Sequence, residues 1–173
     1  MALAHQDVEQ VIRALCQRLG QSAAKVKKAY QLDPFSFVLN FLPATASATT
    51  TARFTVQNDS AFAICKTAYI ATDTSDVAVA NLQPFGSGGA SSFAPFLVTL
   101  TDSGSGRALS DLGVPIDSWF GNGQRPYLWT IPKLLDPNST FEAAVQNLSV
   151  TDRRVRLAFH GYKVFGDIAA FQR

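Results

Sequence analysis

The N-terminal part of the chain places hydrophobic residues on one side of a helix. Between residues 7 and 19 they recur every three or four positions, which is the period of an amphipathic α-helix. Gly20 follows as a stop signal, because glycine readily adopts the left-handed conformation that ends many helices. The residues on this face are Val8, Val11, Ile12, Leu15 and Leu19. The pattern predicts an amphipathic helix within an N-terminal segment, residues 1–30.

A basic run follows this helix, with lysines at Lys25, Lys27 and Lys28. Such a run either extends the helix or forms a flexible basic tether. If the run is only a solvated face of the helix, its role is structural. If it belongs to an N-terminal arm, the arm docks on a neighbouring subunit. The sequence leaves both interpretations open.

From residue 31 onward the pattern changes to short runs of β-branched and aromatic residues separated by turn residues. Seven runs predict strands, at residues 35–42, 51–57, 62–71, 93–101, 127–131, 140–146 and 154–165. No helical period separates these runs, and parallel strands need long crossover connections, so we expect antiparallel pairing. Residues 31–173 are therefore predicted to form a mainly β domain, an antiparallel β-sandwich.

The predicted strands differ in how many of their faces are apolar. The last strand alternates, with Val155, Leu157 and Phe159 on one side and Arg154, Arg156 and His160 on the other. Residues 61–65 are instead apolar on both sides. A strand of that kind suits the middle of a sandwich, or a sheet whose outer face is covered by another chain.

Prolines mark the turns of the C-terminal half. Pro126 and Pro132 bracket the strand at 127–131 and are expected to block its extension, because proline cannot donate a ladder hydrogen bond. Residues 136–139 read Asp-Pro-Asn-Ser, which places proline at the second position of a four-residue turn with asparagine after it. This pattern predicts a hairpin between the strands on either side.

Length and cysteine content fit one domain made in a reducing compartment. The chain has 173 residues, and its cysteines, Cys16 and Cys65, are expected to be separate buried thiols. Acidic residues occur near the start, where an export signal carries a basic region, so the chain is expected to be made and kept in a reducing cell interior. No run approaches the roughly 20 apolar residues that span a bilayer. A net charge of +2 is too small to imply nucleic acid, so neither nucleic acid nor a membrane is an expected partner.

Side chains suited to catalysis are few. His5 and His160 have no serine in a nucleophile-elbow motif to pair with, and two histidines and two cysteines at unrelated positions do not supply four zinc ligands. The glycine-rich segments 86–89 and 104–106 lack the spacing of a phosphate-binding loop. Four aspartates begin turns, where they serve local hydrogen bonding: Asp111, Asp117, Asp136 and Asp152. The sequence predicts no catalytic residue, no cofactor, no metal site and no enzymatic activity.

The C-terminal part of the chain carries a combination of short segments. They are residues 114–121 (VPIDSWFG), 123–132 (GQRPYLWTIP), 135–141 (LDPNSTF), 145–149 (VQNLS) and 155–165 (VRLAFHGYKVF). Together they resemble the C-terminal part of virion proteins from tailed bacteriophages, of the small kind that decorates or cements the capsid. The resemblance implies a jelly-roll-like β-sandwich with an N-terminal amphipathic helix or arm.

The resemblance also implies a function and partners. A structural virion protein on the capsid surface would bridge neighbouring subunits of the major capsid protein and would associate with itself, as a dimer or a trimer. The candidate interface residues are Val8, Val11, Ile12, Leu15 and Leu19 on the helix and the aromatic Trp119, Phe120, Tyr127 and Trp129. The alternative function is a phage fibre-like or lectin-like module that binds a host receptor or a glycan.

Overall fold

The computed structural model of the protein describes residues 2–44, 46–72, 94–121, 125–150 and 152–166. Three helices lie in these ranges: α1 (Ala2–Leu19), α2 (Ala23–Ala29) and α3 (Ile116–Trp119). The longer strands are β1 (Gln31–Ala44), β2 (Thr49–Thr55), β3 (Ala61–Thr72), β4 (Phe96–Asp102), β7 (Tyr127–Leu135), β8 (Thr140–Asn147) and β9 (Arg153–Phe165). Two short strands are β5 (Arg107–Ala108) and β6 (Val114–Pro115). Each of the seven predicted strands corresponds to one of the longer strands.

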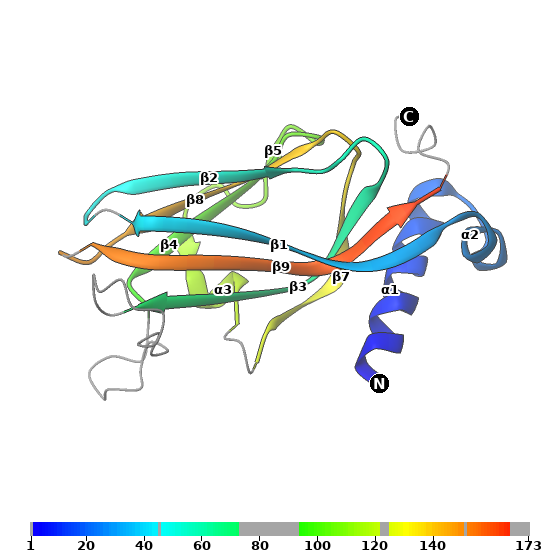
Figure 1. The fold of residues 1–173 in the computed structure, drawn as a ribbon, viewed down its shortest axis with the longest axis horizontal. Helices are drawn as coiled ribbons and strands as arrows, with labels where there is room; N and C mark the ends of the chain where they lie inside the picture. Colours follow the sequence, from blue (N-terminus) through cyan, green and yellow to red (C-terminus); the bar gives the residue numbers. More distant parts are fainter. Residues whose placement is uncertain (1, 45, 73–93, 122–124, 151, 167–173) are drawn as a thin grey trace.

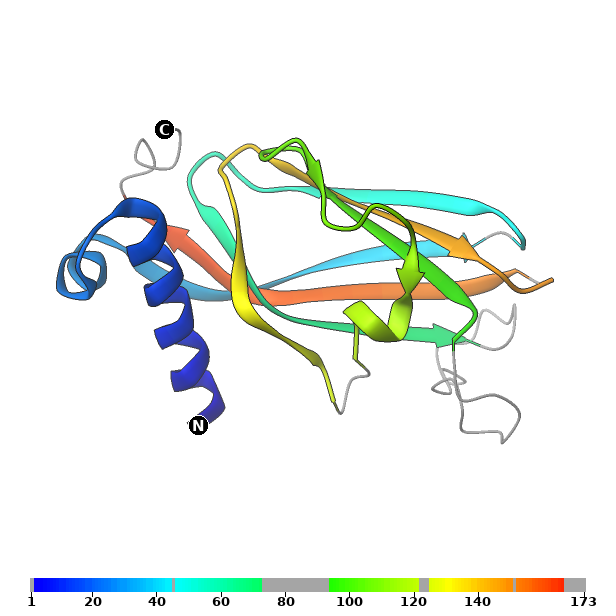
Figure 2. The same cartoon turned by 180° about the vertical axis from the view of Figure 1, so that it is seen from behind.

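The strands form two antiparallel sheets that face each other (Figure 1, Figure 2). Sheet A has the strand order β1-β9-β3-β7, and sheet B has the order β2-β8-β4-β5, with β6 also paired to β4. The pairing is nested, because β1 pairs with β9, β2 with β8 and β3 with β7. Consecutive long strands therefore alternate between the sheets, which is the arrangement of a jelly roll. The predicted jelly-roll-like β-sandwich is confirmed.

The main hydrophobic core fills the space between the sheets. Strands β4 and β8, and β9 as far as Phe159, alternate between buried and more exposed positions, as strands with one inward face must. On β9 the inward residues are Val155, Leu157 and Phe159, so the predicted facing of this strand is confirmed. Aromatic rings join the layers: Phe54 of β2 stacks on Phe37 of β1 with 4.0 Å between ring centroids. Burial of such rings supplies much of the hydrophobic stabilisation.

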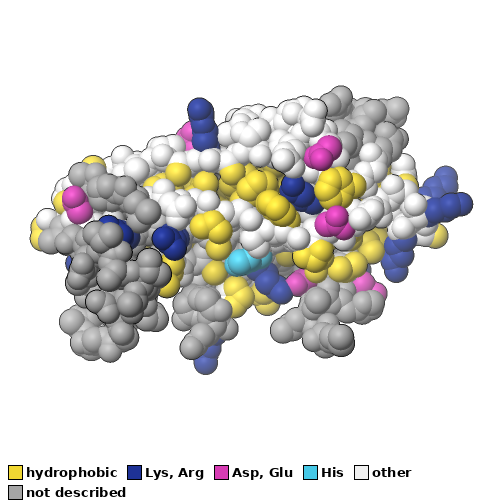
Figure 3. Space-filling model, in the orientation of Figure 1, with side chains coloured by type: hydrophobic (Ala, Val, Ile, Leu, Met, Phe, Trp, Pro, Cys, Tyr) yellow, Lys and Arg dark blue, Asp and Glu magenta, His cyan; other side chains and the backbone are white. Residues whose placement is uncertain are grey.

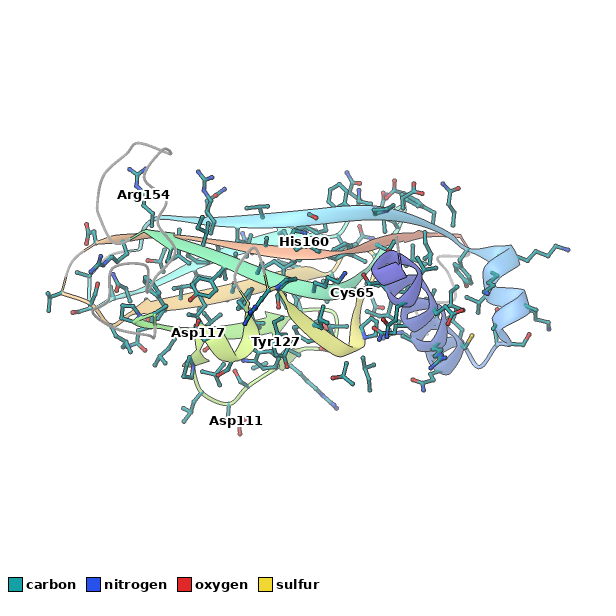
Figure 4. All side chains as sticks on the ribbon, turned by 90° about the horizontal axis from the view of Figure 1, so that it is seen from below. Cys65, Asp111, Asp117, Tyr127, Arg154 and His160 are labelled. Atoms are coloured by element: carbon teal, nitrogen blue, oxygen red, sulfur yellow. The ribbon has the colours of Figure 1, made fainter. Side chains whose placement is uncertain are left out.

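A second hydrophobic cluster lies on the outer face of sheet A, beneath α1 (Figure 4). Its buried members are Val11, Ile12, Ala14, Leu15, Val26, Tyr30, Ala61, Ala63, Cys65, Leu134, Tyr162 and Val164. Strand β3 serves both clusters, because Phe62 and Ile64 belong to the main core. The chain's own helix covers the outer face of β3, and this explains why residues 61–65 are apolar on both faces.

A bulge in β3 separates the two parts of the strand. The register against both neighbours shifts between Ile64 and Lys66, so Cys65 stands opposite no residue. In β9, Gly161 lies opposite Ile64, and a Cβ atom at Gly161 would lie 1.8 Å from the carbonyl oxygen of Ala63. The bulge therefore brings two backbones so close together that this position requires glycine.

Ion pairs hold both ends of α1 on the sandwich. Near its N-terminal end, Asp7 pairs with Lys66 of β3 at 2.5 Å. Near its C-terminal end, Arg18 donates two hydrogen bonds to the Asp136 carboxylate, at 2.7 and 2.8 Å. Partly exposed pairs of this kind contribute little stability. Their placement at opposite ends fixes the direction in which the helix crosses the strands.

The expectation that Pro132 ends its strand is wrong. Strand β7 continues through Pro132 to Leu135. Its pairing with β3 passes from Leu128 directly to Lys133, and the four residues between them have no partner in that ladder. A proline fits there because no ladder hydrogen bond is required of it.

The expectation of a hairpin at residues 136–139 is also wrong, although the turn itself has the predicted shape. Asn138 has a φ of 61°, and the Ser139 N–H donates to the Asp136 carbonyl at 3.1 Å. The turn joins β7 of sheet A to β8 of sheet B. It is therefore a crossing between the two layers, since the strands that it connects do not pair with each other.

Candidate interaction surface

The five predicted helix residues lie against the chain's own sheet. Val11 and Leu15 are fully buried, and Ile12 is almost so. Val8 and Leu19 are partly buried beside them. These side chains fill the cluster under α1, and of the five, Val8 and Leu19 retain surface for a partner chain.

The four predicted aromatic residues come together where α3 meets the start of β7. Phe120 is buried in the main core and contacts Phe159 edge to face, with ring centroids 5.5 Å apart. Trp119 and Trp129 stack at 5.3 Å, and Tyr127 meets Trp129 edge to face at 6.4 Å. The structure thus groups all four residues, with Phe120 inside the core and the two tryptophans packed against it.

Hydrogen bonds fix this aromatic group on β3. The Thr67 hydroxyl donates to the Trp119 carbonyl and accepts from the Trp129 indole N–H at 3.2 Å. Further along β3, the Tyr69 hydroxyl donates to the Asp117 carboxylate at 2.6 Å. Burial raises the pKa of Tyr69, and the hydrogen bond to Asp117 raises it further, so the phenol stays protonated. These bonds make the group rigid, which lowers the entropic cost of binding a partner.

The start of β7 presents apolar side chains at the border of sheet A, and we call residues 127–131 the β7 edge. Tyr127 is 38% exposed, Leu128 56% and Ile131 69%. Within the part of the chain that the structure describes, β7 pairs with β3 on one side and with no strand on the other. The run is uncharged and has a proline on each side. Exposed apolar surface of this kind is typical of interaction sites.

The sequence points to Tyr127 and Trp129 in this edge, but it does not single out Leu128 and Ile131. In a regular strand, Leu128 and Ile131 lie on opposite faces, and one of them is buried. The irregular register before Lys133 leaves both exposed. Pro132 is the local signal that could have indicated this irregularity.

A polar groove lies on the outer face of sheet A, beside α1. Ser36 of β1, His160 of β9 and Lys66 of β3 stand directly opposite one another across three strands. Ser36 Oγ lies 2.7 Å from His160 Nδ1, and Asp7 of α1 pairs with Lys66. The groove has a volume of about 400 Å³ and is lined by Asp7, Pro34, Phe35, Ser36, Lys66, His160, Gly161 and Tyr162. We call it the α1 groove.

Two titratable groups near the α1 groove are held in their neutral forms. Burial raises the pKa of Cys65 to about 12, and the Asp7 carboxylate adds to the shift. Burial also raises the pKa of Tyr162, again with a contribution from Asp7. Because a thiolate is the reactive form of cysteine, the Cys65 thiol is not an activated nucleophile. Cys16 and Cys65 are both free thiols, with Cys65 buried and Cys16 partly buried.

The described residues contain no group of three or more histidine, cysteine, aspartate or glutamate side chains that could hold a metal ion. In the same ranges, no helix has the length and apolar character to cross a membrane. The glycine-rich turn at 104–106 closes on Asp102, whose carboxylate accepts from the Gly104 N–H at 3.0 Å. Segment 86–89, residue 93 and the side chain of His5 lie outside the described residues.

No protein-family model matches the chain, and a comparison with curated proteins finds no match. By its structure, the protein is a jelly-roll β-sandwich with an N-terminal amphipathic helix packed on one sheet. Its surface adds an apolar strand edge and a polar groove, both on sheet A. Because jelly rolls host many functions, a functional conclusion has to rest on these surface features.

Proposed function

We propose that the protein is a structural component of a tailed-bacteriophage particle, where it decorates or cements the capsid by bridging neighbouring major capsid subunits. The resemblance of the C-terminal segments to virion proteins supports this proposal. So does the jelly-roll fold, which recurs among viral capsid domains. The observation that carries the proposal is the β7 edge, an uncharged apolar run on a rigid two-sheet body.

The physical basis is burial of apolar surface. Leu128 and Ile131 are the most exposed large hydrophobic side chains of the β7 edge, and covering them on a coat subunit removes their apolar area from water. Each square ångström so buried contributes about 25 cal/mol. A standard interface of about 1,600 Å², repeated over a shell, stabilises the shell without any bond being made or cut.

Multiple attachment strengthens the effect. A symmetric dimer or trimer places several copies of the β7 edge in one particle-bound unit. Release then requires all contacts to break together, so the avidity exceeds the affinity of one contact. The partners on this proposal are the major capsid protein and further copies of the same chain, and the protein resides on the capsid surface.

The direct test mixes the purified protein with capsid shells that lack decoration. We expect the protein to sediment with the shells and to raise the temperature at which calorimetry records shell disruption. The heat-unfolded protein serves as a control for non-specific adsorption. Absence of sedimentation together with an unchanged disruption temperature would contradict the proposal.

A second candidate function has one observation in its favour. Tyr127 presents a partly exposed ring beside the stacked Trp119 and Trp129, and exposed aromatic rings suit stacking on a sugar. On this interpretation the protein is a fibre-like or lectin-like module for a glycan or a host receptor. Binding of the purified protein to a glycan array without shells, lost in Tyr127→Ala, would favour this function over capsid attachment.

A further inference from the structure

Basic side chains line the outer face of sheet A along β9. Val155 and Leu157 point into the main core, so Arg154 and Arg156 point the opposite way. His160 lies on the same outer face, where it lines the α1 groove. We call Arg154, Arg156 and His160 the β9 stripe. Figure 4 looks onto this side of the sheet and shows Arg154 at the end of β9 far from α1 and His160 near the helix.

The charge of the β9 stripe is not neutralised by the residues that the structure describes. In those ranges neither Arg154 nor Arg156 forms an ion pair with a carboxylate. Asp7, the acid that lines the α1 groove, is engaged by Lys66. The face as a whole therefore carries excess positive charge, which attracts an acidic partner and favours its encounter.

Apolar positions lie between the basic ones. Val38 of β1 is 51% exposed and stands opposite Ala158 of β9, between Arg156 and His160 along the face. At the level of His160, Leu128 of the β7 edge stands opposite Lys66. From Arg154 to His160 the strand rises about 20 Å, the length of an extended peptide of about six residues. On the adjoining side of the molecule, where β1 and β2 run, hydrophobic side chains also gather at the surface (Figure 3).

We infer that the outer face of sheet A binds an extended acidic polypeptide segment, with carboxylates on the β9 stripe and one acidic side chain in the α1 groove. The forked donors of Arg154 and Arg156 match carboxylates in a bidentate manner. At His160, Nδ1 is engaged by Ser36, and when the Ser36 hydroxyl donates there, Nε2 carries the ring proton and donates to the ligand. The identity of the partner as a coat-protein segment rests on the proposed function.

A polypeptide fits this face better than nucleic acid does. Nucleic-acid sites neutralise many phosphates and usually belong to strongly basic domains. Here the net charge is +2, and the basic residues of the stripe alternate with Ala158 and the exposed Val38. A mixed acidic and apolar segment satisfies both kinds of position.

The test uses poly-L-glutamate as the probe and isothermal titration calorimetry as the measurement. We expect the wild-type protein to bind it in low salt and the double variant Arg154→Glu/Arg156→Glu to bind at least tenfold more weakly. The control, Lys25→Glu/Lys28→Glu, changes the net charge equally at exposed positions of α2 and is expected to bind like the wild type. If the glutamate variant fails to fold, Arg154→Gln/Arg156→Gln replaces it.

Three results would overturn the inference: no binding of poly-L-glutamate, equal losses in the stripe variant and the control, or tighter binding of a single-stranded oligonucleotide than of poly-L-glutamate. Sedimentation with undecorated shells separates this inference from the proposed function. If the stripe variant loses poly-L-glutamate binding but attaches to shells as the wild type does, a coat-protein segment is ruled out as the partner of this face and capsid attachment stands. If the wild type binds poly-L-glutamate through the stripe but ignores shells, capsid attachment fails and the acidic-segment site stands.

Discussion

At the scale of single residues, Asp102 shows how the two sheets are joined. It lies at the end of β4 in sheet B and is 3% exposed. Its carboxylate accepts from Lys133 of β7 in sheet A at 2.7 Å and from Ser105 at 2.9 Å. Burial alone raises the pKa of Asp102, but the hydrogen bonds from Lys133, Ser105 and the Gly104 N–H outweigh it and lower the pKa. The carboxylate is therefore charged in the folded protein and links the layers.

Replacing Asp102 with Asn is expected to lower the free energy of unfolding at neutral pH by about 2 to 3 kcal/mol, because Lys133 loses its buried partner. Since the folded-state pKa is lowered, the stabilisation from the charged carboxylate is present above the unfolded value of about 4. It is lost as the pH falls through the lowered value. Urea unfolding of wild type and variant at pH 7 and at acid pH measures the difference, which should shrink on acidification. Asp111→Asn, at an exposed position, is the control, and an equal loss at both pH values would contradict this account.

Gly161 offers a second test at the residue scale. A Cβ atom there would lie 1.8 Å from the Ala63 carbonyl oxygen, and that oxygen belongs to a neighbouring strand backbone that cannot turn away. Gly161→Ala is therefore expected to lower the free energy of unfolding by at least about 3 kcal/mol. The comparison is Gly20→Ala, which has open space around its Cβ position but a φ of +62°, and which should cost about 1 kcal/mol. Similar denaturant midpoints for the two variants would contradict this expectation. They would mean that the two backbones move apart at Gly161 at little cost in free energy.

At the scale of elements, the sequence predicts those strands whose environment is set by the sandwich alone. The first part of β9, as far as Phe159, alternates because one face meets the core, so its facing can be predicted from period two. Residues 61–65 defeat this reasoning, since an apolar outer face looks the same whether a helix or another chain covers it. The irregular pairing around Pro132, which exposes Leu128 and Ile131, depends on contacts with β3 and has no period to reveal it. Which strand faces are covered, and where a strand loses its partner, therefore depend on long-range packing that the local sequence pattern does not reveal.

Helix α1 is part of the folded body, because its apolar face is buried on sheet A. Leu15 is fully buried between the helix and sheet A. Leu15→Ala is expected to lower the free energy of unfolding by about 3 kcal/mol, through lost apolar contact and the cavity that remains. Arg13→Ala, at an exposed position of the same helix, should change it by less than about 0.5 kcal/mol. Chemical denaturation with circular dichroism measures both. A Leu15→Ala protein as stable as the wild type would mean that the helix is only loosely attached to the sheet.

At the scale of the whole molecule, the two outer faces of the sandwich differ. The outer face of sheet B is polar along its strands, with Thr51, Thr99 and Thr101 among its members and with Arg53 opposite Glu142. Sheet A carries α1, the α1 groove, the β9 stripe and the β7 edge on its outer face and border. We therefore expect partners to approach sheet A while sheet B faces solvent. The two proposed contacts then lie side by side, because Leu128 of the edge and His160 of the stripe are both neighbours of Lys66.

On the proposed function, the β7 edge attaches the molecule to a capsid shell. Leu128→Glu/Ile131→Glu places charge on the β7 edge at exposed positions, so the melting temperature should stay close to that of the wild type. Attachment to undecorated shells should weaken at least about tenfold. The introduced carboxylates would be desolvated at the centre of an apolar contact without a partner of opposite charge. The control is Leu112→Glu/Val150→Glu, which adds the same charge at two exposed apolar positions outside the edge. Sedimentation titrations should separate the two double variants. Equal attachment of all three proteins would mean that the shell contacts another surface, and equal weakening of both variants would mean that net charge, and not the β7 edge, governs attachment.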